Sequence, residues 1–179
     1  ERVWVAARDR SGLFADVCGA LTGSGYEILS VTTFARQDGL VFDRFAVQPS
    51  DPAPPAERWP RLTEAVTGVV EGRIRAADLI ARRARREPHR PPGPRPPVRV
   101  RIEDDVAPDL TVVDVSAPDR LGLLHDLARA LSTAGCDIRL AKVVTKGNRA
   151  VDVFHVTGPD GRPLDEPTRG AVAAALRAA

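Results

Sequence analysis

The sequence is poor in aromatic residues and contains no methionine. Only 4% of its 179 residues are Phe, Trp or Tyr, although 43% are hydrophobic. A core can therefore form, but it must consist mainly of Val, Leu, Ile and Ala side chains, and general disorder is disfavoured. The length suits one ordinary domain or two small ones.

Cysteine, net charge and long apolar runs are also scarce. Cys18 and Cys136 form no Cys-x-x-Cys pair and are too few for a disulfide framework, which favours a reducing, cytoplasmic compartment. The 26 Lys and Arg residues nearly balance the 24 Asp and Glu residues, so charge alone indicates no nucleic-acid partner. No apolar run approaches a membrane span and no signal-peptide pattern is present, so no membrane partner is expected. The sequence begins at Glu1 without methionine, and we expect it to be a segment of a longer protein.

One stretch of the sequence occurs twice. DRSGLFADVCGALTGSGYEI begins at Asp9, and DRLGLLHDLARALSTAGCDI begins 110 positions later at Asp119. Random matching gives about one or two identities in twenty positions. Nine positions are identical here: Asp9/Asp119, Arg10/Arg120, Gly12/Gly122, Leu13/Leu123, Asp16/Asp126, Ala20/Ala130, Leu21/Leu131, Gly25/Gly135 and Ile28/Ile138. This internal repeat predicts two similar structural units.

Both copies predict the same order of elements. Apolar residues recur at helical spacing after each turn, and short turns such as Asp38-Gly39 separate alternating runs that are typical of strands. Ser11 is a candidate N-cap of the first helix. For the first copy the predicted elements are strands at 2–7, 28–34 and 40–47 and helices at 13–23 and 56–67. For the second they are strands at 110–116, 138–145 and 150–156 and helices at 122–134 and 166–178.

This order predicts an α+β fold of two ferredoxin-like β-α-β-β-α-β units, each an antiparallel sheet with helices on one face. Between the copies lies an Arg- and Pro-rich insertion at 68–97, with a helical piece at 73–87 and a semi-rigid Pro-rich linker at 88–97. The alternating run Val98–Asp104 is predicted to be the fourth strand of the first unit. The first domain is thus expected to span 1–104 and the second 105–179. The sheets join side by side or the helices stack, and we expect one body because a single copy has a marginal core.

The repeated turn resembles that of the ACT domain, a small amino-acid-sensing module. The ACT turn reads Asp-x-Pro-Gly-Leu-Leu, and here Ser11 and Leu121 replace the proline. The hairpin stretches GLVFDRFAVQPSD and GNRAVDVFHVTGPDGRPL, and the final helix without a following strand, resemble the tandem ACT pair that ends the PII-protein uridylyltransferase/uridylyl-removing enzymes. That resemblance implies glutamine sensing and control of metal-dependent nucleotidyltransferase and HD hydrolase domains. The PII signalling protein would then be a partner of the parent enzyme.

The sequence itself carries no catalytic constellation. It has no Gly-Ser motif with paired aspartates, and His125-Asp126 lacks the further ligands that an HD metal site needs. We therefore expect no catalytic residue, no metal ligand and no cofactor in this segment. Alternatives are an ACT module of another amino-acid-responsive regulator, a free-standing ACT-repeat protein, a complete small enzyme or a nucleic-acid binder. The arginines between Arg82 and Arg90 lack interleaved aromatics, so we interpret them as a solvated helix face or a contact to further domains.

The repeated turns are the candidate ligand sites. A helix start has unpaired N–H groups that can bind the carboxylate of an amino acid, and Gly12 and Gly122 permit close approach. Asp9 or Asp119 would meet the ammonium group, and the resemblance places Thr32 and Lys142 where ACT ligands rest against the sheet. The predicted ligand-binding residues are Asp9, Arg10, Ser11, Gly12, Leu13, Phe14, Asp119, Arg120, Leu121, Gly122, Leu123, Leu124, Thr32 and Lys142.

The sequence leaves open which copy binds the ligand. It is compatible with a homodimer through ACT sheets or helices. Asp43 and Asp152 precede Phe-containing strand segments, and we interpret both as solvent-face or hairpin residues.

Overall fold

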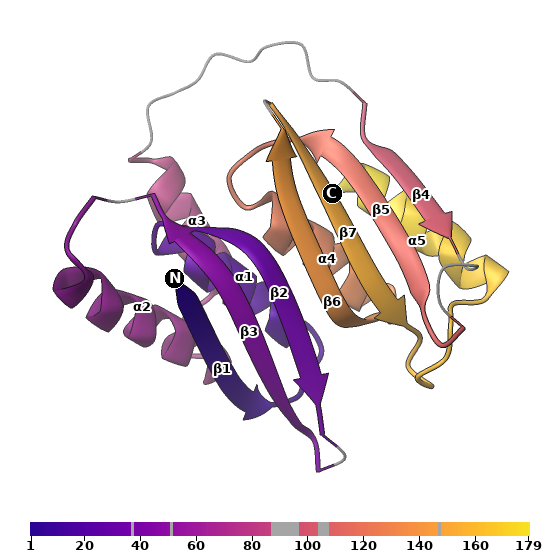
Figure 1. Ribbon diagram of the computed structural model, residues 1–179, viewed down its shortest axis with the longest axis horizontal. Coiled ribbons are helices and arrows are strands. Elements are labelled where there is room, and N and C mark those ends of the chain that lie inside the picture. The colour runs from indigo at the N-terminus through magenta and orange to yellow at the C-terminus, as the bar shows by residue number, and fades with distance from the viewer. Residues whose placement is uncertain (37, 51, 87–96, 104–107, 147) are drawn as a thin grey trace.

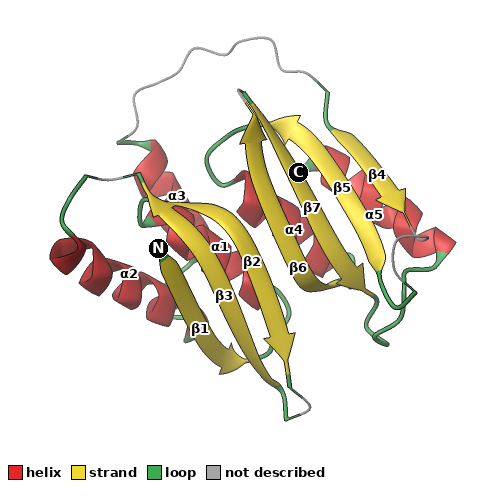
Figure 2. Cartoon of the chain, in the orientation of Figure 1, coloured by secondary structure: helices red, strands yellow, loops and turns green. Residues whose placement is uncertain are grey.

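The computed structural model describes residues 1–36, 38–50, 52–86, 97–103, 108–146 and 148–179. The first unit contains β1 (Arg2–Arg8), α1 (Leu13–Gly23), β2 (Tyr26–Ala35), β3 (Leu40–Pro49) and α2 (Pro55–Val70), followed by α3 (Ala76–Ala84). The second contains β4 (Arg99–Glu103), β5 (Thr111–Pro118), α4 (Leu123–Thr133), β6 (Asp137–Lys146), β7 (Arg149–Thr157) and α5 (Glu166–Ala178). The predicted α+β fold, an antiparallel sheet with helices on one face, is confirmed (Figures 1 and 2).

The two units share one seven-stranded sheet of order β1-β3-β2-β6-β7-β5-β4. They meet where β2 pairs with β6, with Val31 opposite Ala141. Both of these side chains are fully buried and lie on the helix-covered face of the sheet. On that face α1 contacts α4. We call this junction, β2 with β6 and α1 with α4, the seam; of the two expected arrangements, the sheets join side by side.

The strand predicted after the proline tract forms, but its predicted partner is wrong. β4 pairs antiparallel with β5 of the second unit, with Val100 opposite Val115 and Ile102 opposite Val113. β4 therefore lies at the sheet edge farthest from β1, as Figure 1 shows. Only residues 104–110 separate β4 from β5, and a short connection between antiparallel strands makes them neighbours. The second unit thus has four strands and the first three, so the strand belongs after the domain boundary.

The other predicted boundaries agree more closely with the structure. The insertion predicted at 68–97 begins inside α2, which continues to Val70, and its helical piece is the shorter α3. Residues 88–96 of the predicted linker, and Asp104, lie outside the described residues. Among the helices that the structure describes, none is long and apolar enough to cross a membrane.

The core consists of aliphatic side chains, as the composition requires. Leu13, Val17 and Leu21 of α1 are at most 3% exposed, and so are Ala15 and Cys18 on other sides of that helix. Burial around most of a helix occurs when it has neighbours on several sides. α1 contacts α2, α3, α4 and β2. The contact with α4 places α1 beside the seam.

Candidate functional site

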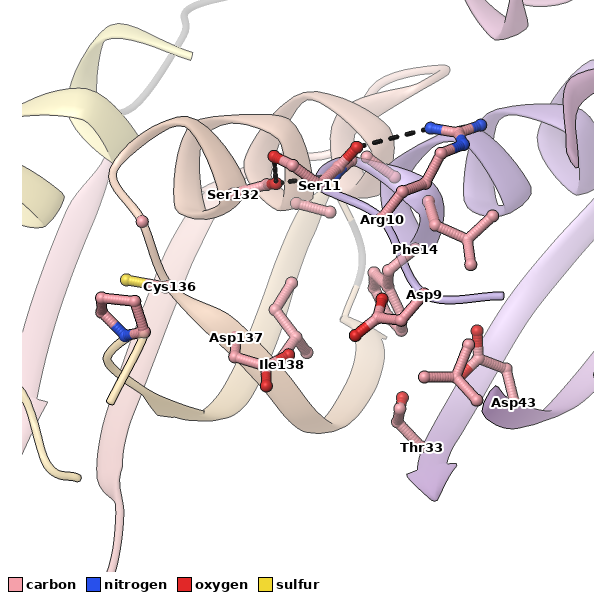
Figure 3. A pocket seen from close by; sticks show the side chains of 17 residues that line it. Asp9, Arg10, Ser11, Phe14, Thr33, Asp43, Ser132, Cys136, Asp137 and Ile138 are labelled. Atoms are coloured by element: carbon pink, nitrogen blue, oxygen red, sulfur yellow. Dashed lines mark hydrogen bonds between the residues drawn. The ribbon is translucent and has the colours of Figure 1, made fainter. Parts of the chain in front are cut away.

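A cavity of about 370 Å³ opens at the seam, beside the start of α1. The first unit contributes the turn that leads from β1 into α1 and side chains from β2 and β3, and the second contributes the end of α4 and the start of β6 (Figure 3). The lining residues are Asp9, Arg10, Ser11, Gly12, Leu13, Phe14, Ala15, Thr33, Val41, Asp43, Ala128, Ser132, Gly135, Cys136, Asp137, Ile138 and Pro159. The site is therefore shared by both units.

The turn before α1 is built around Gly12. This residue adopts a left-handed conformation with φ of 78° at the N-cap position, which favours glycine. The prediction that Ser11 caps the helix is wrong, because α1 has no side-chain cap of its own. Instead the Gly12 N–H donates to Ser132 Oγ at 2.8 Å, and Ser11 Oγ lies 3.0 Å from the same oxygen.

Two amide groups at this helix start have no partner within the described ranges. The Leu13 N–H donates to the Arg10 carbonyl at 3.1 Å, and the Gly12 N–H is used by Ser132. Phe14 and Ala15 follow, and both line the cavity. The first amides of a helix are unpaired and lie at its positive end, so they can bind an anionic group.

Asp43 of β3 supplies a buried carboxylate to the same cavity. Its side chain is 2% exposed, and Oδ1 has no hydrogen-bond partner in the part of the chain that the structure describes. Thr33, opposite Asp43 on β2, has a buried hydroxyl close enough to Asp43 to favour its charged form, although the two groups do not reach the geometry of a full hydrogen bond. The pKa of Asp43 is raised to about 6: burial is the main cause, the Thr33 hydroxyl opposes the rise, and the charge of Asp9 adds to it. A buried polar group without a partner is costly, so this pair is suited to bind a polar ligand.

The interpretation of Asp43 and Asp152 as solvent-face or hairpin residues is therefore wrong. Asp152 of β7 is 1% exposed, and its Oδ1 also lacks a partner among the described residues. A sequence signal existed, because Asp43 alternates in step with the buried Phe45 and Val47. Residues two apart on a strand point to the same face.

Acidic side chains line the cavity, and the Arg10 guanidinium is not available to neutralise them. Asp9 and Asp137 reach toward the space between the units, as Figure 3 shows. Burial raises the pKa of Asp137, Arg139 opposes the rise, and Asp9 adds to it. Arg10 is held elsewhere, because Nη1 lies 2.8 Å from Asp16 Oδ2 and Nη2 donates to the Val69 carbonyl at 3.0 Å. Carboxylates and residues with free amides that line one cavity suit a zwitterion, which carries one ammonium and one carboxylate group.

The second turn has the same local design but does not line this cavity. Gly122 has φ of 78°, and Arg120 binds Asp126 at 2.6 Å and the Ala179 carbonyl at 2.6 Å. All six predicted residues of the first turn line the cavity. Those of the second turn do not: Asp119, Arg120, Leu121, Gly122, Leu123 and Leu124.

Thr32 and Lys142, the two predicted strand residues, also lie away from the cavity. They flank the buried pair Val31 and Ala141 in the β2–β6 register, so they point to the helix-free face of the sheet. Thr32 Oγ1 is 3.5 Å from the Arg44 guanidinium there. It is Thr33, the next residue, that faces the cavity.

His125 and Asp126 are used structurally. His125 is buried, and its Nδ1 lies 2.8 Å from the Ala15 carbonyl oxygen across the seam. Because a carbonyl only accepts, Nδ1 carries the proton. Asp126 pairs with Arg120. Within the described ranges no group of three or more His, Cys, Asp or Glu residues is arranged to hold a metal ion.

Comparison with known proteins agrees with this architecture. Residues 111–174 match the ACT domain, so the second unit is an ACT domain, and the internal repeat makes the first unit a second copy of that fold. Over most of its length the chain is related to bifunctional uridylyltransferase/uridylyl-removing enzymes. It is 34% identical to the enzyme of Gluconobacter oxydans over 174 residues, which cover 92% of this chain and 18% of the relative. It is 35% identical to that of Phenylobacterium zucineum over 189 residues, which cover 99% of this chain and 19% of the relative. The chain thus spans about a fifth of the length of these relatives.

A solved structure shows the same fold. Aspartate kinase from Synechocystis superposes with a TM-score of 0.51 at 15% identity, over 99% of this chain and 26% of that one.

Proposed function

We propose that this chain is a regulatory module that binds glutamine, or a similar small amino acid, in the cavity at the first turn. The observation that carries the proposal is the buried Asp43 carboxyl, whose Oδ1 has no hydrogen-bond partner among the described residues, in a cavity that the start of α1 also lines. Its volume of about 370 Å³ lies at the small end of ligand pockets, as a free amino acid requires.

Each part of an amino acid has a counterpart in the cavity. The Phe14 and Ala15 amides would bind the α-carboxylate, with the positive end of α1 favouring its charge. Asp43 and Asp9 would bind the α-ammonium group. The Thr33 hydroxyl can donate and accept, so it can serve the side-chain amide of glutamine. Affinity would be modest, because a free amino acid has few atoms to contribute.

The site lies between the two units, so ligand binding would act on the arrangement of these units. Asp43 and the free amides belong to the first unit, whereas Ser132 and Asp137 belong to the second. A ligand between the units shifts their arrangement only if it binds one arrangement more tightly than another. The relatives carry both uridylyltransferase and uridylyl-removing activities in their names. We place this chain as the module that controls nucleotidyltransferase and HD hydrolase domains of a PII-modifying enzyme in the cytoplasm, where free thiols such as Cys18 and Cys136 persist.

The test is calorimetric titration of the chain with glutamine, with glutamate and other small amino acids as comparisons. Asp43→Asn removes the buried charge, and Asp152→Asn makes the same change at the equivalent position outside the cavity. We expect Asp43→Asn to weaken glutamine binding at least tenfold and Asp152→Asn to leave it within twofold. Equal binding by the parent and Asp43→Asn would place the ligand elsewhere. Preference for another amino acid would favour an ACT module of a different regulator.

A further inference from the structure

The two turns that precede α1 and α4 have the same backbone but different surroundings. Gly12 and Gly122 both have φ of 78°. A Cβ atom added at Gly12 would have nothing within 4 Å, whereas one added at Gly122 would lie 3.1 Å from Ile80 Cγ2 and 3.3 Å from Ile80 Cδ1. Ile80 of α3 thus fills at the second turn a space that is empty at the first.

Glycines of α1 hold α3 in this position. A Cβ atom at Gly19 would lie 2.8 Å from the Ala76 Cβ, and one at Gly23 would lie 2.6 Å from the Leu79 Cβ. Because a side chain at either position would clash with α3, only glycine at 19 and 23 allows α3 to pack this closely against α1. At the equivalent positions α4 has Arg129 and Thr133, so it offers no such surface beside Gly12. The difference between the two turns therefore follows from the residues at these positions of α1 and α4.

The covered turn keeps most of the groups that make the first turn a candidate site. Asp119 occupies the position of Asp9, and Asp152 that of Asp43. Asp152 is 1% exposed with an unpartnered Oδ1, and its pKa is raised to about 7 by burial and by Asp119. One polar group is missing, because Val143 stands where the first copy has Thr33. The second turn therefore retains the charged groups that would bind an ammonium group, with fewer partners for a polar side chain.

We infer that the second turn is a second amino-acid site, which α3 keeps closed by inserting Ile80 over Gly122. The chain would bind one amino acid while α3 is docked and a second when α3 withdraws. This inference rests on the proposed function, since it assigns the same ligand class to the second copy. It makes α3 an internal competitor for one of two equivalent sites.

The test compares ligand stoichiometry with and without the Ile80 side chain. Ile80→Ala removes the atoms over Gly122, and Leu79→Ala is the matched control, because Leu79 lies against Gly23 and not against the turn. Calorimetry with glutamine would give the number of sites, and the amide resonances of Gly12 and Gly122 would show which turn is occupied. We expect one site in the parent and in Leu79→Ala, with a shift at Gly12 only. Ile80→Ala should have two sites with shifts at both glycines, and adding Asp152→Asn should restore one.

The outcomes separate this inference from the proposed function. One site in both the parent and Ile80→Ala would overturn the closed second site and leave the first intact. No site in the parent but one at Gly122 in Ile80→Ala would support the role of α3 and overturn the site at the first turn. No binding by either would overturn both. If Ile80→Ala does not fold, Gly23→Ala, whose Cβ would lie 2.6 Å from the Leu79 Cβ and therefore displace α3, provides the same comparison through the Gly122 resonance: a glutamine-dependent shift there supports the closed site, and none overturns it.

Discussion

Ser132 Oγ accepts a hydrogen bond from the Gly12 amide at 2.8 Å, so a side chain of the second unit caps the first helix of the first unit. Loss of a helix cap typically costs about 1 kcal/mol. We expect Ser132→Ala to lower the free energy of unfolding by about that amount, measured by urea denaturation. Thr22 holds the equivalent position of α1, and no hydrogen bond of its hydroxyl occurs among the described residues. Thr22→Ala should therefore change stability less; an equal loss would contradict the capping role of Ser132.

Asp43 and Asp152 should make the protein less stable as the pH rises. In the unfolded chain both carboxyls ionise near their ordinary pKa of 3.8, whereas in the folded protein their pKa values are about 6 and about 7. The folded state therefore binds more protons in this window, and the stability contributed by the protonated carboxyls is lost between about pH 4 and pH 7. Each loss is on the order of a few kcal/mol.

Asparagine substitutions isolate this effect. The stability of Asp43→Asn minus that of the parent should increase from about pH 4 to pH 6 and then level off, and for Asp152→Asn the increase should extend to about pH 7. Urea denaturation at several pH values measures both differences. A difference that does not change with pH would mean that the buried carboxyls titrate normally.

The affinity for glutamine should depend on pH through Asp43. An ammonium group gains a charged partner only when Asp43 is ionised, and its pKa is about 6 in the free protein. Affinity should therefore fall as the pH decreases below about 6, approaching tenfold per pH unit. Calorimetric titrations between about pH 5 and pH 8 would measure it. The residual binding of Asp43→Asn should lack this dependence, and a parallel fall in both proteins would assign the titration to another group.

Gly12 and Gly122 form a matched pair for a stability test. Alanine at either position must adopt a left-handed conformation, which costs roughly 1–2 kcal/mol. Only at Gly122 would the new Cβ also press on Ile80, 3.1 Å away. Gly122→Ala should thus be more destabilising than Gly12→Ala in urea denaturation. The excess should disappear in an Ile80→Ala background, and an excess that persists there would show that Ile80 is not its cause.

The repeat in the sequence predicts the fold class and the element order, and it marks both turns alike as candidate ligand sites. It could not assign β4, because alternation identifies a strand but not its partner, and β1 and β5 hold equivalent places in the two units. The short connection to β5 decides between them. The two copies also share the turn motif, so the motif alone could not show that Ile80 covers Gly122 and leaves Gly12 open. That difference depends on how α3 folds back onto Gly19 and Gly23.

The place of β4 in the chain has a practical consequence. α3 ends at Ala84 and β4 begins at Arg99, so a break between residues 86 and 97 would leave every described helix and strand intact in one of two pieces. Two separately produced polypeptides, 1–86 and 97–179, would then meet only through the seam and the helices beside it. Asp43 would come from one polypeptide and Ser132 from the other. An amino acid bound between them would stabilise the complex of the two polypeptides. Its effect would be measurable as a lower dissociation constant of that complex.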